Sequence, residues 1–235
     1  MRAGRLLRER GVTLLSLDLD DTLLDTDAAA EYRVQAAAQR ASEVLGGLDV
    51  AMVDQALRAA MAANPVTQGR MAQFLQTLGV EPQSNEATAI RAQYNAVMLD
   101  ALVLMEGAEV TLSRLREHYR LAIVTNGPTE MQWPKLRKFA LEGLVDHVVV
   151  SGDLGVHKPD PAIFRHLLTE AGVEADSAAH VGDSIHSDIA GALAAGMTAI
   201  WMPPHLRAHD EVGEHQPHAV IETLADLLDS VSDEG

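Results

Sequence analysis

Two aspartates, Asp18 and Asp20, stand at the end of an apolar run that begins at Val12. Charged side chains are rarely placed at the tip of a buried strand unless they have a function. Because side chains alternate along an extended chain, both carboxylates point to the same side. Two close carboxylates repel each other, so they need a cation or a shared proton. An all-oxygen ligand set suits Mg²⁺, and the sequence therefore predicts a magnesium site here.

A hydroxyl group and free backbone amides follow a second apolar run, in the segment Thr125-Asn126-Gly127. The next residues, 129–132, have the capping-box pattern that begins a helix. A hydroxyl group and amides at a helix N-terminus can hold a phosphate. Taken alone, such a segment is more often a plain turn between a strand and a helix.

A lysine and two further acids complete the polar segments. Lys158 is held extended by the proline that follows it, and it can neutralise a phosphate or keep nearby acids charged. Asp183 and Asp188 follow a third apolar run, which ends at Gly182, where the backbone can approach a neighbour closely. Taken alone, Lys158 could be a solvated lysine, and Asp183 a helix cap. The combination of all four segments at expected strand ends is much more specific.

Strand and helix patterns alternate after Gly107, and we expect the ranges as follows. The strands are 12–18, 120–125, 147–151, 178–182 and 197–202; the helices are 108–118, 129–140, 161–171, 185–195 and about 220–231. Such alternation predicts an α/β fold, a Rossmann-like three-layer core with a parallel sheet between helices. Ligands bind at the carboxyl ends of the strands in such sheets, where all four polar segments lie.

The chain changes character between about residues 26 and 100, where Ala, Gln, Arg, Met and Leu dominate. Four amphipathic helices are expected there, near 27–46, 49–63, 67–78 and 84–100. Glycines and prolines separate them. We therefore predict an α/β core made of residues 1–24 and 103–235, interrupted by an α-helical insert over residues 25–102.

Composition narrows the classes of partner and location. The chain has 235 residues, no cysteine and a formal net charge of −16, so disulfides, thiolate zinc sites and thiol nucleophiles are excluded. A nucleic acid polymer would be repelled over most of the surface. The basic N-terminus lacks a cleavage pattern and no stretch is long enough to cross a membrane, so we expect a cytoplasmic protein without a membrane partner. The sequence carries no signal of oligomeric state.

The four segments together resemble the four motifs of the haloacid dehalogenase superfamily. The matching residues are 18–22, 125–127, 158–159 and 182–188. The resemblance covers the core, and the helical insert after the first motif is similar to the inserted helical cap of that superfamily. It implies a Mg²⁺-dependent phosphatase that hydrolyses a small phosphate monoester, a small phosphorylated metabolite, through an aspartyl-phosphate.

The resemblance also implies roles for single residues. Asp18 would be the nucleophile that attacks phosphorus. Asp20 would be the general acid for the leaving alcohol and then the base for water. Thr125, Asn126 through its backbone amide, and Lys158 would hold the phosphoryl oxygens.

The metal ligands are implied in the same way. Asp18, the carbonyl group of Asp20 and Asp183 would bind Mg²⁺. Asp188 would orient metal-bound waters or Lys158. One magnesium ion and one lysine would supply the charge neutralisation that phosphoryl transfer needs.

Other activities of the same fold stay open. True dehalogenases of the superfamily replace the acid at the position of Asp20, so its presence favours a phosphatase. A phosphomutase keeps both acids, and a binding or regulatory protein could keep the site without turnover. Asp21, at a position where many members have glycine, resembles the branch of pyrimidine nucleotidases and sugar-phosphate phosphatases. Residues 125–127, with Gln132, Lys135 and Leu136 after them, are similar to the nucleotidase branch. A nucleoside monophosphate or a sugar phosphate is therefore the expected substrate class.

Several other polar and aromatic residues have a plainer interpretation. The segment with His205, His209, His215 and His218 contains prolines and many charges, so we interpret it as a loop rather than an ordered metal site. We expect solvated helix faces for Arg33, Arg70 and Arg91 of the insert. We expect Trp133 and Trp201 to pack at the edge of the core.

Overall fold

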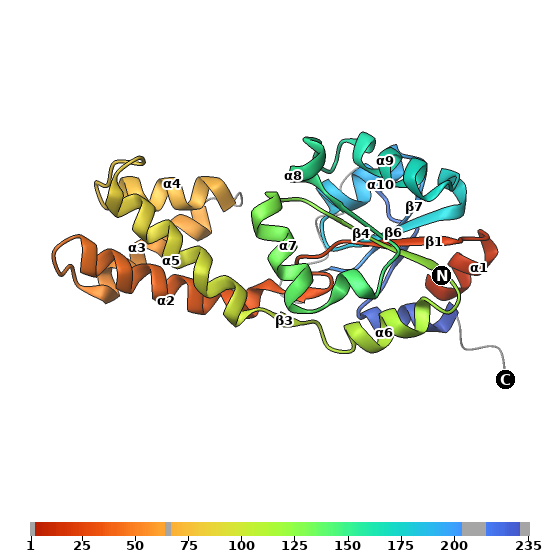
Figure 1. Ribbon diagram of the computed structural model, residues 1–235, viewed down its shortest axis with the longest axis horizontal. Coiled ribbons are helices and arrows are strands. Elements are labelled where there is room, and N and C mark those ends of the chain that lie inside the picture. The colour runs from red at the N-terminus through yellow and green to blue at the C-terminus, as the bar shows by residue number, and fades with distance from the viewer. Residues whose placement is uncertain (1–2, 64–66, 204–214, 231–235) are drawn as a thin grey trace. The chain divides into compact units, whose positions relative to one another are not determined.

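The computed structural model describes residues 3–63, 67–203 and 215–230 (Figure 1). The chain divides into two compact units. One unit comprises residues 1–25 and 104–235, and the other comprises residues 26–103. No helix among the described residues has both the length and the apolar character needed to cross a membrane.

The first unit is built on a six-stranded parallel sheet in the order β5-β4-β1-β6-β7-β8. The strands are β1 (Leu14–Leu17), β4 (Arg120–Thr125), β5 (His147–Val150), β6 (Ala178–Gly182), β7 (Thr198–Trp201) and β8 (Ala219–Val220). The central strands are almost entirely buried, as expected for a parallel sheet covered on both faces. Because the strand order reverses on either side of β1, a ligand crevice is expected at its carboxyl end.

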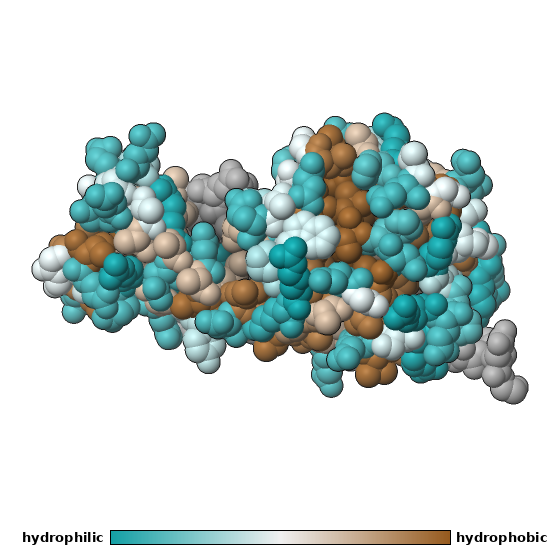
Figure 2. All heavy atoms as spheres, viewed as in Figure 1, coloured by the Kyte–Doolittle hydropathy of each residue, from teal (hydrophilic) through white to brown (hydrophobic). Residues whose placement is uncertain are grey.

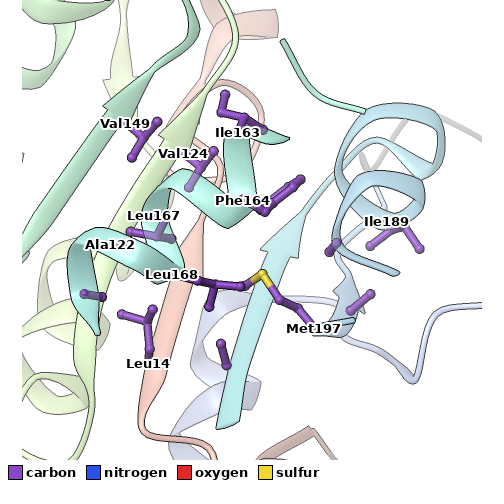
Figure 3. Close-up of a cluster of buried hydrophobic side chains, with 14 of the residues drawn as sticks. Leu14, Ala122, Val124, Val149, Ile163, Phe164, Leu167, Leu168, Ile189 and Met197 are labelled. Atoms are coloured by element: carbon purple, nitrogen blue, oxygen red, sulfur yellow. The ribbon is translucent and has the colours of Figure 1, made fainter. Parts of the chain in front are cut away.

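Helices cover both faces of this sheet (Figure 1). On one face lie α9 (Pro161–Ala171), the π-helical turn η3 (Ile185–Ile189) and α10 (Ala190–Ala194); on the other lie α1 (Ala3–Glu9), α6 (Ala108–Leu115) and the 3-10 helix η5 (Leu224–Ser230). Figure 3 shows Phe164 and Leu167 of α9 packed with Leu14 and Val124 of the sheet. The expectation of an α/β, Rossmann-like core is confirmed.

Four further elements of the first unit connect its strands. Three of them are α7 (Thr129–Lys138), which follows β4, the 3-10 turn η1 (Leu141–Gly143) and α8 (Ser151–Leu154), which follows β5. The fourth, the 3-10 turn η2 (Ala175–Ser177), precedes β6. Because α7 begins four residues after β4 ends, its first turn lies next to the carboxyl edge of the sheet.

The second unit consists of four helices: α2 (Thr26–Val44), α3 (Val50–Ala63), α4 (Thr67–Thr77) and α5 (Asn85–Ala101). Its own hydrophobic core contains Leu57, Phe74, Leu75 and Ile90, all buried. Ser84 caps α5, since its hydroxyl oxygen accepts a hydrogen bond from the Ala87 N–H group. Two short strands, β2 (Leu24–Asp25) and β3 (Val103–Leu104), form a separate two-stranded sheet where the chain passes between the units.

The C-terminal part of the core differs from the sequence expectation. The helix expected near 220–231 is present but begins only at Leu224 and is 3-10. Val220 instead belongs to β8, where it pairs with Trp201 of β7. The Asp226 carboxylate accepts hydrogen bonds from the N–H groups of Glu222 and Thr223, both at 2.9 Å. These bonds fix a turn before Leu224, so the helix cannot begin earlier.

The remaining differences are smaller. The first strand is shorter than the expected 12–18, and the helix expected over 185–195 is a π-helical turn followed by α10. Neither α1 nor α8 was expected. The π-helical turn lies immediately after the acidic segment, where such turns often occur at functional sites.

Candidate active site

The predicted site residues follow three neighbouring strands of the core sheet. Asp18 directly follows β1, Thr125 is the last residue of β4, and Asp183 directly follows β6. The Asp18 N–H group donates to the Val181 carbonyl oxygen at 2.9 Å, which continues the pairing of β1 with β6. The carboxyl ends of these strands therefore bring the side chains to one edge of the sheet.

Lys158 is the cation at the centre of this edge. Its ammonium group donates to Asp18 Oδ1 at 2.5 Å and to the Val124 carbonyl oxygen at 2.8 Å. It also lies 2.7 Å from Asp188 Oδ1. Lys158 is 4% exposed, so its charge is compensated almost entirely by these protein oxygens. One buried lysine thus joins two of the predicted acids.

The side chain of Asn126 holds the loop that carries Lys158. Asn126 Oδ1 accepts from the Lys158 N–H group at 2.8 Å, and Asn126 Nδ2 donates to the Lys158 carbonyl oxygen at 2.9 Å. The amide side chain therefore fixes the backbone of the lysine. The expected contact of the Asn126 backbone amide with a phosphoryl oxygen stays a prediction.

For both Lys158 and Asp188, burial and the neighbouring opposite charge have opposite effects on ionisation. Burial works against the charged form of each, but the two charges stabilise each other. The carboxylates of Asp18 and Asp188 raise the pKa of Lys158 above its usual value despite its burial. Lys158 and the hydrogen bond with His180 likewise lower the pKa of Asp188 despite its burial. Both groups are therefore charged at neutral pH.

For the other two acids, nearby positive charge does not fully offset the effect of burial. Burial, aided by the charge of Asp188, raises the pKa of Asp18 to about 7, although Lys158 acts against this shift. Burial and the charges of Asp18 and Asp188 raise the pKa of Asp183 to about 9. These carboxylates need a further positive charge if both are to be ionised at neutral pH.

The acids are close enough to share a metal ion. Asp18, Asp183 and Asp188 each offer one carboxylate oxygen, and these oxygens lie within 4.8 Å of one another. Among the described residues this is the one such group of three or more potential ligands. An all-carboxylate set fits a hard divalent cation such as Mg²⁺, and the raised pKa values of Asp18 and Asp183 agree with such a charge.

Asp188 is already engaged by protein groups at both oxygens. Its Oδ1 atom faces Lys158 at 2.7 Å and His180 Nε2 at 3.3 Å. Its Oδ2 atom accepts from the Ser184 N–H group at 3.0 Å. The structure therefore leaves Asp18 and Asp183 as the acids with oxygens available to a cation, and places Asp188 behind Lys158.

The hydroxyl group of Thr125 is buried without a partner. Thr125 is 1% exposed, and its Oγ1 atom has no hydrogen-bond partner among the described residues. Buried polar atoms are nearly always hydrogen-bonded, so an exception calls for an explanation. A phosphoryl oxygen bound beside Lys158 would supply the partner.

Asp20 is held by two residues of α7. Lys135 donates to Asp20 Oδ1 at 2.8 Å and to Oδ2 at 2.6 Å. Gln132 Nε2 donates to Asp20 Oδ2 at 3.3 Å. The sequence singled out Gln132 and Lys135 only as part of a resemblance. Their spacing of three residues on one helix face was the signal that could have paired them with Asp20.

A second contact that sequence reasoning missed lies beneath Asp188. His180, in β6, is fully buried, with Ser16 Oγ 2.9 Å from its Nδ1 atom and Asp188 Oδ1 on the other side. Burial lowers the pKa of His180, so the ring is neutral at neutral pH. A neutral ring that donates to the Asp188 carboxylate through Nε2–H has Nδ1 as its acceptor, and the Ser16 hydroxyl beside it also lies 3.1 Å from the Ala179 carbonyl oxygen as a donor. A polar residue inside the apolar strand Ala-Ala-His-Val-Gly was the available signal.

His218 and the two tryptophans have hydrogen bonds with groups of the core. His205 and His209 lie outside the described residues. His218 Nδ1 accepts from the Ala199 N–H group at 3.1 Å. Trp201 is buried, and its indole nitrogen donates to the Asp183 carbonyl oxygen at 2.7 Å, so it also holds the acidic loop. Trp133 donates to Asp153 at 2.8 Å.

Two arginines of the helical unit have local partners. The guanidinium group of Arg33 lies 3.9 Å from the centre of the Tyr94 ring, a cation–π contact within the unit. Arg91 donates to the Pro82 carbonyl oxygen at 2.6 Å. The side chain of Arg70 lies outside the described residues. Both arginines therefore make contacts within the helical unit itself.

The chain belongs to the haloacid dehalogenase-like hydrolase family, whose pattern matches residues 12–196. A glyceraldehyde 3-phosphate phosphatase of Pyrococcus furiosus is 30% identical over 226 residues, 94% of this chain and 93% of the relative. The expected family resemblance is thus confirmed, and the fold and the site define a hydrolase of this family.

Two solved structures resemble the protein over 94% of its length. A HAD-hydrolase, YfnB of Bacillus subtilis, bound to magnesium, is 26% identical with a TM-score of 0.74, and 99% of that chain is covered. A 2-haloacid dehalogenase of Pseudomonas syringae pv. Tomato is 29% identical with a TM-score of 0.66, and 98% of that chain is covered. Because the fold alone does not determine the reaction, the residues of the site have to be used to distinguish the possible activities.

Proposed function

We propose that the protein is a Mg²⁺-dependent phosphatase that hydrolyses small phosphate monoesters through an aspartyl-phosphate on Asp18. The observation that carries the proposal is the placement of Asp18 against the ammonium group of Lys158, beside a second acid, Asp183, and the unpartnered hydroxyl of Thr125. A nucleophile, a charge-neutralising cation, metal ligands and a phosphoryl-oxygen donor are the parts that phosphoryl transfer requires.

The proposed reaction has two half-reactions. An oxygen of Asp18 attacks phosphorus, the bond from phosphorus to the alcohol oxygen breaks, and Asp20 gives that oxygen a proton. Water then attacks the phosphorus of the aspartyl-phosphate, Asp20 takes a proton from the water, and inorganic phosphate leaves as Asp18 is regenerated. Lys158, Thr125 and the backbone amide of Asn126 hold the phosphoryl oxygens through both steps.

Magnesium would be held by Asp18, Asp183 and the carbonyl group of Asp20, and it would neutralise charge on the phosphoryl group. The acidic set fits this role, since Asp18 and Asp183 are the carboxylates whose pKa values are raised by burial, so that a further positive charge would favour their ionised forms. Asp188 supports Lys158 from behind.

The substrate class that we propose is a nucleoside monophosphate or a sugar phosphate. With a formal charge of −16 the protein must hold an anion by local groups, and Figure 2 shows hydrophilic side chains over much of the displayed face.

We propose that the helical unit of residues 26–103 is a cap that selects the substrate and excludes water during chemistry.

The decisive assay compares three reactions of the purified protein. Hydrolysis of p-nitrophenyl phosphate that depends on added Mg²⁺ and stops with a chelator is expected. Chloride release from a 2-chloro acid would instead identify a dehalogenase, and interconversion of sugar phosphates without net phosphate release would identify a mutase. Absence of all three would favour a binding protein. A screen of nucleoside monophosphates against sugar phosphates then identifies the substrate.

A further inference from the structure

We propose that Lys135 and Gln132 of α7 position the carboxylate of Asp20 for proton transfer, and that Lys135 is the principal positioning residue. The inference rests on the proposed function, in which Asp20 is the general acid and base. It concerns the buried face of α7, whose residues Gln132 and Lys135 lie outside the four motifs.

The contacts of Lys135 engage both oxygens of one carboxylate. The Lys135 ammonium group lies 2.8 Å from Asp20 Oδ1 and 2.6 Å from Asp20 Oδ2. A cation that contacts both oxygens restricts rotation of the carboxylate about the Cβ–Cγ bond. It also fixes the distance between the carboxylate and α7. Asp20 lies between β1 and β2, outside a regular element, so the chain around it constrains its side chain less than a strand would.

The burial of Lys135 shows that this pair is built into the fold. The Lys135 side chain is 4% exposed, whereas the Asp20 side chain is 28% exposed. Arg137 and Lys138, on the same helix, are exposed. Burying an ammonium group costs free energy unless it is paired, and Asp20 is the acid that pairs with it. The exposed part of Asp20 leaves its carboxylate accessible for proton exchange.

Gln132 supports the same carboxylate from one turn earlier. Its Nε2 atom donates to Asp20 Oδ2 at 3.3 Å and to the Asn126 carbonyl oxygen at 3.1 Å. Gly127 makes this possible, because a Cβ atom there would lie 2.2 Å from Gln132 Nε2. The phosphate-binding segment and the Asp20 carboxylate are therefore connected through one amide group.

The expected consequence is a loss specific to proton transfer. A general acid has to lie within hydrogen-bond reach of the leaving oxygen, and misplacement by about 1 Å can cost about 10²-fold in rate. We expect Lys135→Met to lower kcat/KM by about 10²-fold for an alkyl phosphate, whose leaving group needs a proton. The loss should be much smaller for p-nitrophenyl phosphate, whose leaving group does not.

The kinetic test is a double-mutant cycle of Lys135→Met with Asp20→Asn, read with the alkyl phosphate that the wild type hydrolyses fastest. Lys135→Met should cause no further loss once Asp20 is replaced, because it acts through that side chain. Lys135→Arg should restore part of the rate, and Lys138→Met is the matched control on the exposed face of α7. Equal losses for both leaving groups, or additive losses in the cycle, would overturn the proposal.

The wild type, the two single variants of the cycle and the double variant also give a second readout, the melting temperature, which does not need turnover. Asp20→Asn leaves the buried Lys135 without its carboxylate, so it should lower the melting temperature, and adding Lys135→Met should recover part of that loss. Additive shifts in melting temperature would show that Lys135 and Asp20 are not energetically coupled as an ion pair. If the wild type hydrolyses no phosphate monoester while the melting temperatures are coupled, the ion pair stands, and the proposed function and the role in proton transfer fail.

Discussion

Substitutions of Thr125 and of Asp18 should have different effects on stability and activity, because the environments of the two side chains differ. Thr125 is buried with an unpartnered oxygen, whereas Asp18 is tied to Lys158 at 2.5 Å. Removing the first should cost the folded protein little, because no hydrogen bond among the described residues is lost. Removing the charge of the second affects a network that includes Asp188.

The first prediction concerns Thr125→Val, a change of nearly the same shape. The free energy of unfolding should change by less than about 1 kcal/mol, since no partner is left unsatisfied. KM for p-nitrophenyl phosphate should rise and kcat should fall. The matched control is Thr198→Val, also in a buried strand, whose hydroxyl accepts from Arg10 at 3.3 Å. The control should lose stability and keep its kinetics, and the reverse pattern would contradict the account.

The second prediction concerns Asp18→Asn. Turnover should fall by at least about 10³-fold, because the amide cannot attack phosphorus. The protein should still fold, since burial already opposes the charge on Asp18 and Lys158 keeps Asp188 as its partner. Steady-state rates and circular dichroism check the two halves. Turnover close to that of the wild type would show that residue 18 is not the nucleophile.

At the scale of elements, Gly182 joins β6 to the acidic turn. A Cβ atom there would lie 2.3 Å from Asp188 Cγ, so the absence of a side chain lets Asp188 reach Lys158. The strand and the π-helical turn therefore have to meet at a glycine. The sequence predicted a close approach of the backbone at this position; the structure identifies the neighbour as the Asp188 side chain.

The third prediction follows from that contact. Gly182→Ala should lower the free energy of unfolding by about 1–3 kcal/mol, because a small-to-large change in a packed site forces neighbours to move. It should also lower kcat, since Lys158 loses a support. Gly143→Ala is the matched control, because a Cβ atom there meets nothing within 4 Å. Equal effects of the two substitutions in chemical denaturation and kinetics would refute the proposed contact.

The parallel sheet was predictable because its strands are short apolar runs that end at polar motifs. The strands 120–125 and 178–182 and the helix 161–171 have the expected bounds. The C-terminal 3-10 helix was not predictable, because the bonds from Asp226 to two backbone N–H groups decide where it begins. An apolar pattern does not carry that information.

The site was predictable where its residues belong to the polar segments that follow the strands. Asp18, Lys158, Asp183 and Asp188 form one cluster, as the strand ends indicated. Lys135 was missed as a member of the site because its contact with Asp20 joins residues that are 115 positions apart in the sequence. His180 is only eight residues from Asp188, but the sequence does not show that its ring faces that carboxylate. Burial of a polar residue, which identifies both, is a property of the folded chain.

At the scale of the whole molecule, a negatively charged protein has to hold an anionic substrate and a cluster of acids. A bound divalent cation should reconcile the two, because it compensates Asp18 and Asp183. Anything that binds the folded state alone raises stability, by about 2.7 kcal/mol at a ligand concentration of 100 Kd.

The fourth prediction is therefore a magnesium-dependent melting temperature. Saturating Mg²⁺ should raise Tm by about 5–10 °C in the wild type. Asp183→Asn should lose this response. It should melt higher than the wild type in the presence of a chelator, because burial raises the pKa of Asp183 to about 9, so this carboxyl must take up a proton on folding at neutral pH, a cost that asparagine does not have. Asp176→Asn, an exposed aspartate in η2, is the control and should respond like the wild type. An unchanged response of the Asp183 variant would remove that residue from the metal site.

The most direct test of the whole account is chemical capture of the covalent intermediate. Protein quenched during turnover of p-nitrophenyl phosphate is treated with borohydride, which reduces an acyl phosphate to an alcohol, and the peptides are analysed by mass spectrometry. The account predicts homoserine at position 18, in larger amount in Asp20→Ala, where water attack is slowed, and none in Asp18→Asn. An unmodified residue 18 in a protein that turns over, or modification at another residue, would contradict it.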